Sequence, residues 1–285
     1  MKKSILFIFT ACFLFTTSCS DFLDEEHKTK YSSEYVFGTP EGLKLAVNAL
    51  YALQRYYAND TENATIFALE RGTDLAVTNG GTGNFYGIYD PNYLKPSASQ
   101  VGFMWRTMYQ IIGKANEIIA AAEDLEDTPS LRATVSEAKC FRAQSYFLLY
   151  RTFDRIWLNI QPTTAENVND PRDFHAASEK EVFDLIYEDL EYAITNLDWV
   201  SDEAGRFTQA AARHMKAKAA LWLKDWDTTL EQVEEIEKSG HFDLIALNEV
   251  FNAGDLNHKE ALMVQQWSKN PGGNLSNATP KGNYY

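Results

Sequence analysis

Apolar residues that recur every three or four positions limit the fold of this chain more than any other feature of its sequence. In the segment after residue 100 they are Trp105, Met108, Ile112, Ala115, Ile119 and Ala122. This spacing is typical of an amphipathic helix. It recurs from 130 to about 153, from 182 to 197, from 212 to 222 and from 230 to 237. We therefore expect an all-α fold, with 262–264 as a short candidate strand.

Residues that favour helix ends stand at the borders of several of these segments. Thr39 and Pro40 can occupy the N-cap and the first position of a helix, and Ser130 can cap another. Ser178 and Glu181 have the spacing of a capping box. Gly240 can end the last helix, because glycine tolerates the left-handed backbone found at helix C-caps.

Two of the expected helices form a hairpin. Ala217 and Ala220 on the first are small enough for close packing, and Trp226 opens the second after a short turn. Helix pairs joined by short turns indicate a repeat. The pattern is tetratricopeptide-like, with an ordinary helical hairpin as the alternative. We expect a helical-repeat scaffold that carries long irregular loops.

The N-terminus has the organisation of an export signal. Lys2 and Lys3 precede an apolar run, residues 5–15, that is too short to span a bilayer. Small residues then lead into Cys19, where cleavage is expected. We predict that residues 1–18 are a signal peptide and that Cys19 carries a lipid. An ordinary signal peptide with an incidental cysteine is the alternative.

Acidic residues dominate the chain after this signal. The formal charge is −14 for the full sequence and −16 once Lys2 and Lys3 have left with the signal. Nucleic-acid phosphates would repel such a chain, so we expect no nucleic-acid partner, whereas neutral sugars are not excluded. Residues 19–38 include an acidic run and would form a tether. Residues 39–285 would form the helical domain.

Cys140 is the one cysteine that remains after Cys12 leaves with the signal and Cys19 is lipidated. No internal disulfide can therefore form in the mature chain. Cys140 lies within an expected helix and has no histidine nearby in sequence. A buried structural thiol is favoured over a nucleophile.

A long loop is expected over about residues 58–99, and it holds the candidate ligand site. The glycine-rich stretch 80–83 lies among aromatic and polar residues there. The candidate ligand-binding residues are Arg71, Asp74, Asn84, Phe85, Tyr86, Tyr89 and Tyr93. Flat rings can stack on the apolar faces of pyranoses, while amide and charged groups can bond hydroxyls. The alternative is that these tyrosines pack the loop onto the helices, because such rings often lie half-buried.

The sequence lacks the motifs of the common catalytic sites. It has no Gly-x-Ser-x-Gly elbow and no HExxH pattern. The stretch 80–83 lacks the Lys-Ser/Thr of a phosphate loop. With 40 Asp and Glu residues, pairs of carboxylates arise by chance, so they do not indicate a glycoside hydrolase. We predict a protein that is not an enzyme and that has no cofactor and no metal.

Five segments together resemble the SusD/RagB family of surface lipoproteins, and they follow the family's order. They are 19–24 (Cys-Ser-Asp-Phe-Leu-Asp), 105–119, 137–147, 186–190 and 205–212. The third is similar to the family's Glu-Ala-x-x-x-Arg-Ala-x-x-Tyr-Phe helix. The resemblance extends over nearly the whole mature chain.

Two features depart from that family. The family usually continues with Phe-Gly-Asp-Val-Pro-Leu after the third segment, whereas residues 153–158 read Phe-Asp-Arg-Ile-Trp-Leu. This turn must therefore be built without the glycine and the proline. Family members are also typically about twice as long, so we expect the C-terminal half of the family fold to be missing. A fragment, a truncated gene and an unusual short member are all open.

The resemblance implies a lipid-anchored protein on the outer face of the outer membrane of a Bacteroidetes-type bacterium. The acidic run 21–26 after Cys19 resembles the surface-export signals of such lipoproteins. The family binds oligosaccharides, or peptides in RagB-like members, and passes them to a SusC-like TonB-dependent transporter without catalysis. The alternative is a helical-repeat scaffold that binds proteins at the cell surface and has no small ligand.

Overall fold

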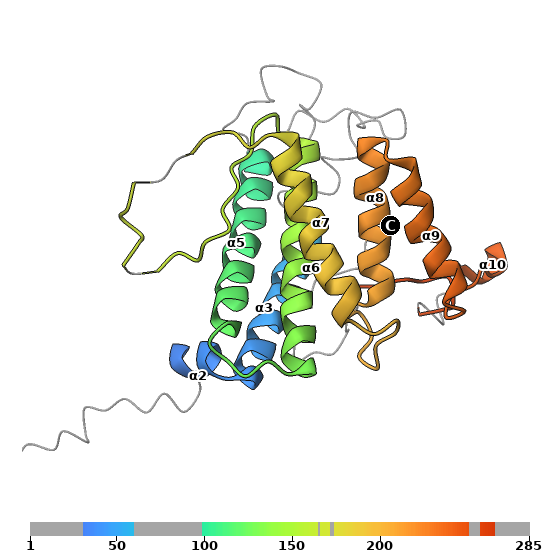
Figure 1. Cartoon of the computed structure of the whole chain (residues 1–285), viewed down its shortest axis with the longest axis horizontal. Coiled ribbons are helices and arrows are strands. Elements are labelled where there is room, and N and C mark those ends of the chain that lie inside the picture. Colours follow the sequence, from blue (N-terminus) through green and yellow to red (C-terminus); the bar gives the residue numbers. More distant parts are fainter. Residues whose placement is uncertain (1–30, 60–98, 165, 172–173, 251–256, 266–285) are drawn as a thin grey trace, which may run out of the picture.

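The computed structural model describes residues 31–59, 99–164, 166–171, 174–250 and 257–265 (Figure 1). These residues form helices and loops, without a strand among them. The helices are α2 (Ser33–Gly38), α3 (Pro40–Asn59), α5 (Ser99–Ala122), α6 (Pro129–Thr152), α7 (Glu179–Asn196), α8 (Gln209–Leu223), α9 (Trp226–Lys238) and α10 (Leu247–Val250). The expected all-α fold is confirmed.

The long helices form an array in which each packs against its neighbours along the chain (Figure 1). α6 lies in the middle, where it contacts α3, α5, α7 and α8. It is buried on several sides, and its fully buried side chains include Phe141, Tyr146 and Leu149. α8 packs against α7 and α9 packs against α8. The core therefore runs through α6 and connects every long helix up to α8.

Three of the expected helix ends are confirmed. The Thr39 hydroxyl accepts a hydrogen bond from the Gly42 amide at 3.0 Å, directly before α3. Ser178 and Glu181 form both halves of the capping box of α7. Gly240 follows α9 with a φ of +70°, which is the left-handed conformation expected after a helix.

The expected cap at Ser130 is wrong. Thr128 caps α6 instead, and its hydroxyl accepts a hydrogen bond from the Leu131 amide at 3.2 Å. Pro129 occupies the first helical position, which suits proline because the amide there needs no partner within the helix. The helix thus begins at the proline, one residue before Ser130, and its N-cap lies two residues before that serine.

α2 is a helix that the sequence analysis did not anticipate, and it lies within the expected tether, residues 19–38. Ser32 caps it by accepting a hydrogen bond from the Tyr35 amide at 3.1 Å. α2 crosses the start of α3 so closely that a Cβ at Gly42 would collide with the backbone of Tyr35 and Val36. A glycine is required at this crossing.

The hairpin of α8 and α9 confirms the tetratricopeptide-like interpretation. Lys224 ends α8 in the left-handed conformation, with a φ of 60°. Asp225 follows at once as the N-cap of α9 and accepts a hydrogen bond from the Thr228 amide at 3.1 Å. The two helices are therefore joined by a turn of two residues.

The apolar faces expected on this hairpin are only partly correct. Trp222, Leu230 and Val233 are 47%, 60% and 41% exposed. The buried residues of α9 are instead Gln232 and Ile236. Periodicity identifies an apolar side of a helix, but the neighbouring helix decides which side is covered.

The short strand expected at 262–264 is wrong. A strand needs a second chain segment to pair with, and no described residue forms a ladder with this one. Met263 instead packs against the hydrophobic core. The apolar run thus anchors the chain after α10 without forming a sheet.

Candidate functional site

The predicted lipid-bearing and ligand-binding residues lie outside the part of the chain that the structure describes. They are Cys19, Arg71, Asp74, Asn84, Phe85, Tyr86, Tyr89 and Tyr93. Their assignments stay predictions. The structure does describe most of the residues on which the family resemblance rests, in the segments 105–119, 137–147, 186–190 and 205–212.

A buried polar network joins α5, α6 and α7. The Asp189 carboxylate is fully buried and accepts hydrogen bonds from Arg142 at 2.8 and 2.7 Å and from the Lys139 ammonium at 2.8 Å. Arg142 also donates to the side-chain carbonyl of Asn116 at 2.8 Å. Asn116 in turn donates to the backbone carbonyl of Asn159 at 2.7 Å. A buried charge needs such partners, so these motif residues stabilise the scaffold.

Two phenols hold the irregular segment after α6. The Tyr109 hydroxyl accepts from the Trp157 amide and donates to the Trp157 carbonyl, both at 2.8 Å. Tyr146 binds the backbone of Asn159 in the same way, at 2.7 and 2.8 Å. Burial raises the pKa of both phenols, which keeps them protonated and able to donate. This is how the turn at 153–158 is built without the family's glycine and proline.

A row of five aromatic rings, which we call the aromatic ladder, lies beside this segment. Its members, in order of contact, are Phe153, Trp105, Tyr109, Trp157 and Phe174. The centroids of successive rings are 5.0, 4.7, 6.4 and 4.8 Å apart. The first three rings pack against the hydrophobic core. Phe174 is 68% exposed. No local sequence pattern groups these five residues, because they are spread over 70 positions on three separate segments.

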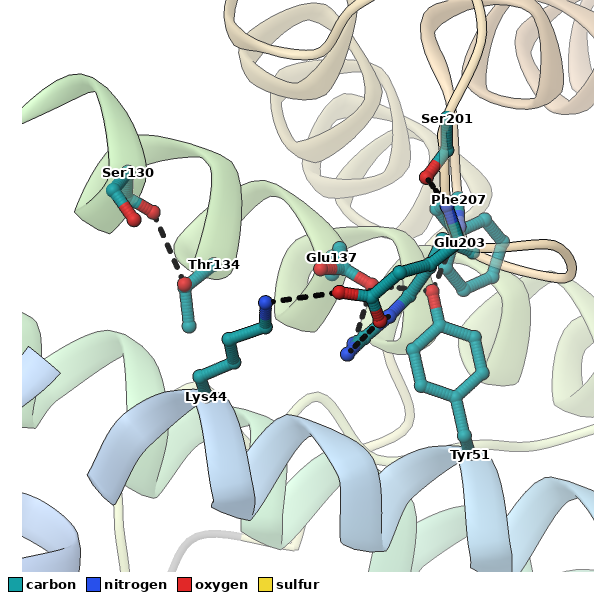
Figure 2. Close-up of polar contacts among 9 residues, drawn as sticks. Lys44, Tyr51, Ser130, Thr134, Glu137, Ser201, Glu203 and Phe207 are labelled. Carbon is teal, nitrogen blue, oxygen red and sulfur yellow. Dashed lines mark hydrogen bonds and ion pairs between the residues drawn. The ribbon is translucent and has the colours of Figure 1, made fainter. Parts of the chain in front are cut away.

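A second polar cluster is centred on Glu137 of α6. Figure 2 shows Tyr51 pointing from α3 toward Glu137, to which its hydroxyl donates a short hydrogen bond. Arg206 donates to the same carboxylate at 3.2 Å and lies over the Tyr51 ring. Burial raises the pKa of the Glu137 carboxyl, and the bonds from Tyr51 and Arg206 oppose that shift.

This cluster fastens the loop between α7 and α8 to the rest of the fold. The Phe207 amide donates to the Tyr51 hydroxyl at 2.7 Å. Glu203 of the same loop accepts from Arg206 at 2.9 Å and from Lys44 of α3 at 3.0 Å (Figure 2). Arg206 and Phe207 belong to the fifth family-like segment. The residues of that segment therefore also stabilise the scaffold.

The described residues were also searched for metal sites, membrane-spanning helices and a reactive thiol. Within them, no group of His, Cys, Asp and Glu could hold a metal ion. None of their helices is both long and apolar enough to cross a membrane. Cys140 is fully buried, as predicted, and burial raises the pKa of its thiol. A nucleophile must be accessible and ionised, so this thiol is structural.

The comparison with known proteins decides the family. A family model described as "Starch-binding associating with outer membrane" matches residues 21–221. The chain belongs to the SusD/RagB family. A SusD-like protein of Bacteroides ovatus is 25% identical over 292 residues, which cover 94% of this chain and 50% of that protein.

Solved structures of SusD-like proteins share the fold. One from Bacteroides fragilis has a TM-score of 0.69 at 20% identity and covers 84% of this chain and 47% of that one. A structure described as a laminarin-binding SusD-like protein has a TM-score of 0.63 at 23% identity, over 72% of this chain and 46% of that one. The chain thus spans about half the length of the curated and solved relatives that it matches.

Proposed function

We propose that this SusD-like chain binds oligosaccharides at the cell surface and delivers them to a SusC-like TonB-dependent transporter. The match of residues 21–221 to a starch-binding, outer-membrane-associating family carries this proposal. The laminarin-binding relative supports it, because a glycan is bound there on the same fold. The role is one of binding and transfer, without catalysis. Lipidation at Cys19 would hold the protein in the outer membrane.

The proposed ligand site is the loop segment that contains Arg71, Asp74, Asn84, Phe85, Tyr86, Tyr89 and Tyr93. Titration calorimetry of the mature chain with laminari-oligosaccharides and xylogluco-oligosaccharides tests the function. Replacing Tyr86 and Tyr89 by alanine should weaken the binding of whichever glycan is retained. Unchanged binding in that double variant would remove the loop from the site.

A protein-binding scaffold is the second candidate, and one observation favours it. Trp226, Leu230 and Val233 are exposed along one side of α9, at 57%, 60% and 41%. Exposed apolar side chains that line one surface often mark protein contacts. If the chain co-purifies with the transporter but binds neither the laminari-oligosaccharides nor the xylogluco-oligosaccharides, this second function is favoured over the first. Adding short peptides to these oligosaccharide probes would detect a RagB-like peptide ligand.

A further inference from the structure

We propose that a cationic patch at one end of the helical array binds the carboxylates of acidic oligosaccharides, those that contain uronic acid residues. The patch consists of Arg151 on α6 and of His214 and Lys218 on α8, beside the rings of Phe147 and Trp222. This inference rests on the proposed function and deepens it by naming the charge of the ligand. The patch includes none of the predicted ligand-binding residues of the loop.

Two helices bring the side chains of the patch together. His214, Lys218 and Trp222 follow one another at every fourth position of α8, so they share one face of that helix. The Phe147 ring of α6 lies perpendicular to the Trp222 ring, with 6.4 Å between the centroids. The C-terminal ends of α6 and α8 lie at the same end of the array (Figure 1). Arg151, one turn after Phe147, therefore lies close enough to Lys218 for their charges to interact.

The cations of the patch have one another as charged neighbours. Partial burial lowers the pKa of the Lys218 ammonium, and the Arg151 guanidinium lowers it further. Partial burial and then the Lys218 charge lower the pKa of His214.

No carboxylate of the described part of the chain forms an ion pair with Lys218 or His214. Lys216 on the same helix does have such a partner, since it pairs with Glu191 at 2.6 Å. Like charges that lie four positions apart on a helix destabilise it. An anion bound between Arg151 and Lys218 would relieve this repulsion.

Arg151 is well placed to bind a carboxylate. Its guanidinium lies over the Phe147 ring, 4.4 Å from the ring centroid, and this cation–π contact helps to hold the group in position. A guanidinium can bind a carboxylate through two parallel hydrogen bonds. Arg151, His214 and Lys218 are all exposed, and Trp222 is 47% exposed, so a ligand can reach the patch.

The net charge of the chain makes local cations necessary for an acidic ligand. The full sequence carries a formal charge of −14, which repels an anionic glycan from most of the surface. Salt screens this repulsion over about 8 Å at physiological ionic strength. The nearest charges therefore decide the contact, and in the patch those charges are positive.

Titration calorimetry of the mature chain with hexagalacturonate and hexamannuronate tests the patch. Fully methyl-esterified hexagalacturonate is the matched neutral probe, because its carboxylates carry no charge. The double variant Arg151→Gln/Lys218→Gln should weaken the binding of the acidic probe roughly tenfold or more, since it removes two charged contacts. Arg132→Gln/Lys238→Gln is the control. It removes the same two residue types at the surface, at the start of α6 and the end of α9, away from the patch.

Each outcome separates the patch from the proposed function. If the chain binds neither acidic probe nor the laminari- and xylogluco-oligosaccharides, the proposed function fails and this inference fails with it. If it binds a neutral glycan but neither acidic hexamer, only this inference is overturned. The same holds if the methyl ester binds as tightly as the acid, if the patch variant keeps its affinity, or if the control loses as much. A loss confined to the patch variant supports the inference, with circular dichroism confirming that both variants are folded.

Discussion

Asp189 illustrates how single residues of the family motif act on the scaffold. Its carboxylate is fully buried and is neutralised by Arg142 and Lys139 from the adjacent helix. The hydrogen bond from Arg142 to the side-chain carbonyl of Asn116 then extends this network to α5. Removing one member leaves the other charged groups buried without a partner. The free energy of unfolding then falls by more than the lost hydrogen bond contributed.

Asp189→Ala should therefore be strongly destabilising. We expect the free energy of unfolding to fall by about 3–5 kcal/mol, because two cations are left uncompensated in the interior. Urea denaturation followed by circular dichroism measures this loss. Asp154→Ala is the control: the ion pair of Asp154 with Arg155 is exposed, so its loss should cost less than about 0.5 kcal/mol. Similar losses of unfolding free energy in the two variants would contradict a stabilising role for the Asp189 network.

Glu137 should make stability depend on pH in a defined direction. Burial raises the pKa of its carboxyl above the ordinary 4.5. A carboxyl whose pKa rises on folding stabilises the protein at low pH, and this contribution is lost as the pH rises through the folded-state pKa. The stability of the unmodified chain relative to Glu137→Gln should thus fall as the pH rises above 4.5. A difference that is constant or grows with pH, in urea titrations, would refute this assignment.

At the scale of elements, α9 shows how a helix is stabilised from one side. Ile236 is 8% exposed and Gln232 is 2% exposed, whereas Leu230 is 60% exposed. The Gln232 side-chain carbonyl accepts a hydrogen bond from Arg213 of α8 at 2.9 Å, which explains how a polar residue is accommodated there. The apolar side chains of α9 therefore do not contribute equally to stability.

Two substitutions in α9 separate these contributions. Ile236→Ala should lower the free energy of unfolding by about 2–4 kcal/mol, because it removes buried methyl groups and leaves a cavity. Leu230→Ala should change it by less than about 0.5 kcal/mol, because the side chain already faces water. Thermal and urea unfolding of both variants provide the comparison. If Leu230→Ala were the more costly, α9 would have to be covered on its outer side in solution.

At the scale of the whole molecule, the two polar clusters lie on different parts of the array. The Asp189 network joins α5, α6 and α7, and the Glu137 cluster joins α3, α6 and the loop before α8. α6 contributes to both: Lys139 and Arg142 belong to the Asp189 network, and Glu137 is the centre of the other cluster (Figure 2). The central helix thus carries the charges that connect the array, and the aromatic ladder is built on the same framework.

Attachment to the membrane is a property of the whole molecule that a single cysteine should control. If Cys19 carries the proposed lipid, Cys19→Ser should release the protein from the outer-membrane fraction, because the proposed acceptor of the lipid is lost. Cys140→Ala should leave the protein in that fraction, since Cys140 is buried in α6. Cell fractionation with immunoblotting measures both. Retention of the Cys19 variant in the membrane would show that another contact holds the chain there.

The sequence by itself determined the features that depend on neighbours three or four positions away. The periodicity predicted α5 to α9, and Thr39, Ser178 and Gly240 marked helix ends correctly, because caps and helical faces are local. The neighbouring proline moved the cap expected at Ser130, and α2 is too short to have a periodicity of its own. The family resemblance was also readable, since motifs are preserved as strings of residues.

Only the tertiary structure decided which distant residues meet. Arg142 and Asp189 are 47 positions apart, and Arg142 and Asn116 are 26 apart, so their pairing depends on how three helices pack. The same packing gathers Trp105, Trp157 and Phe174 into one row and leaves the outer side of α9 exposed. Spacing along a helix shows which residues share a face. Which faces are covered, and by what, follows from contacts between elements that no local pattern specifies.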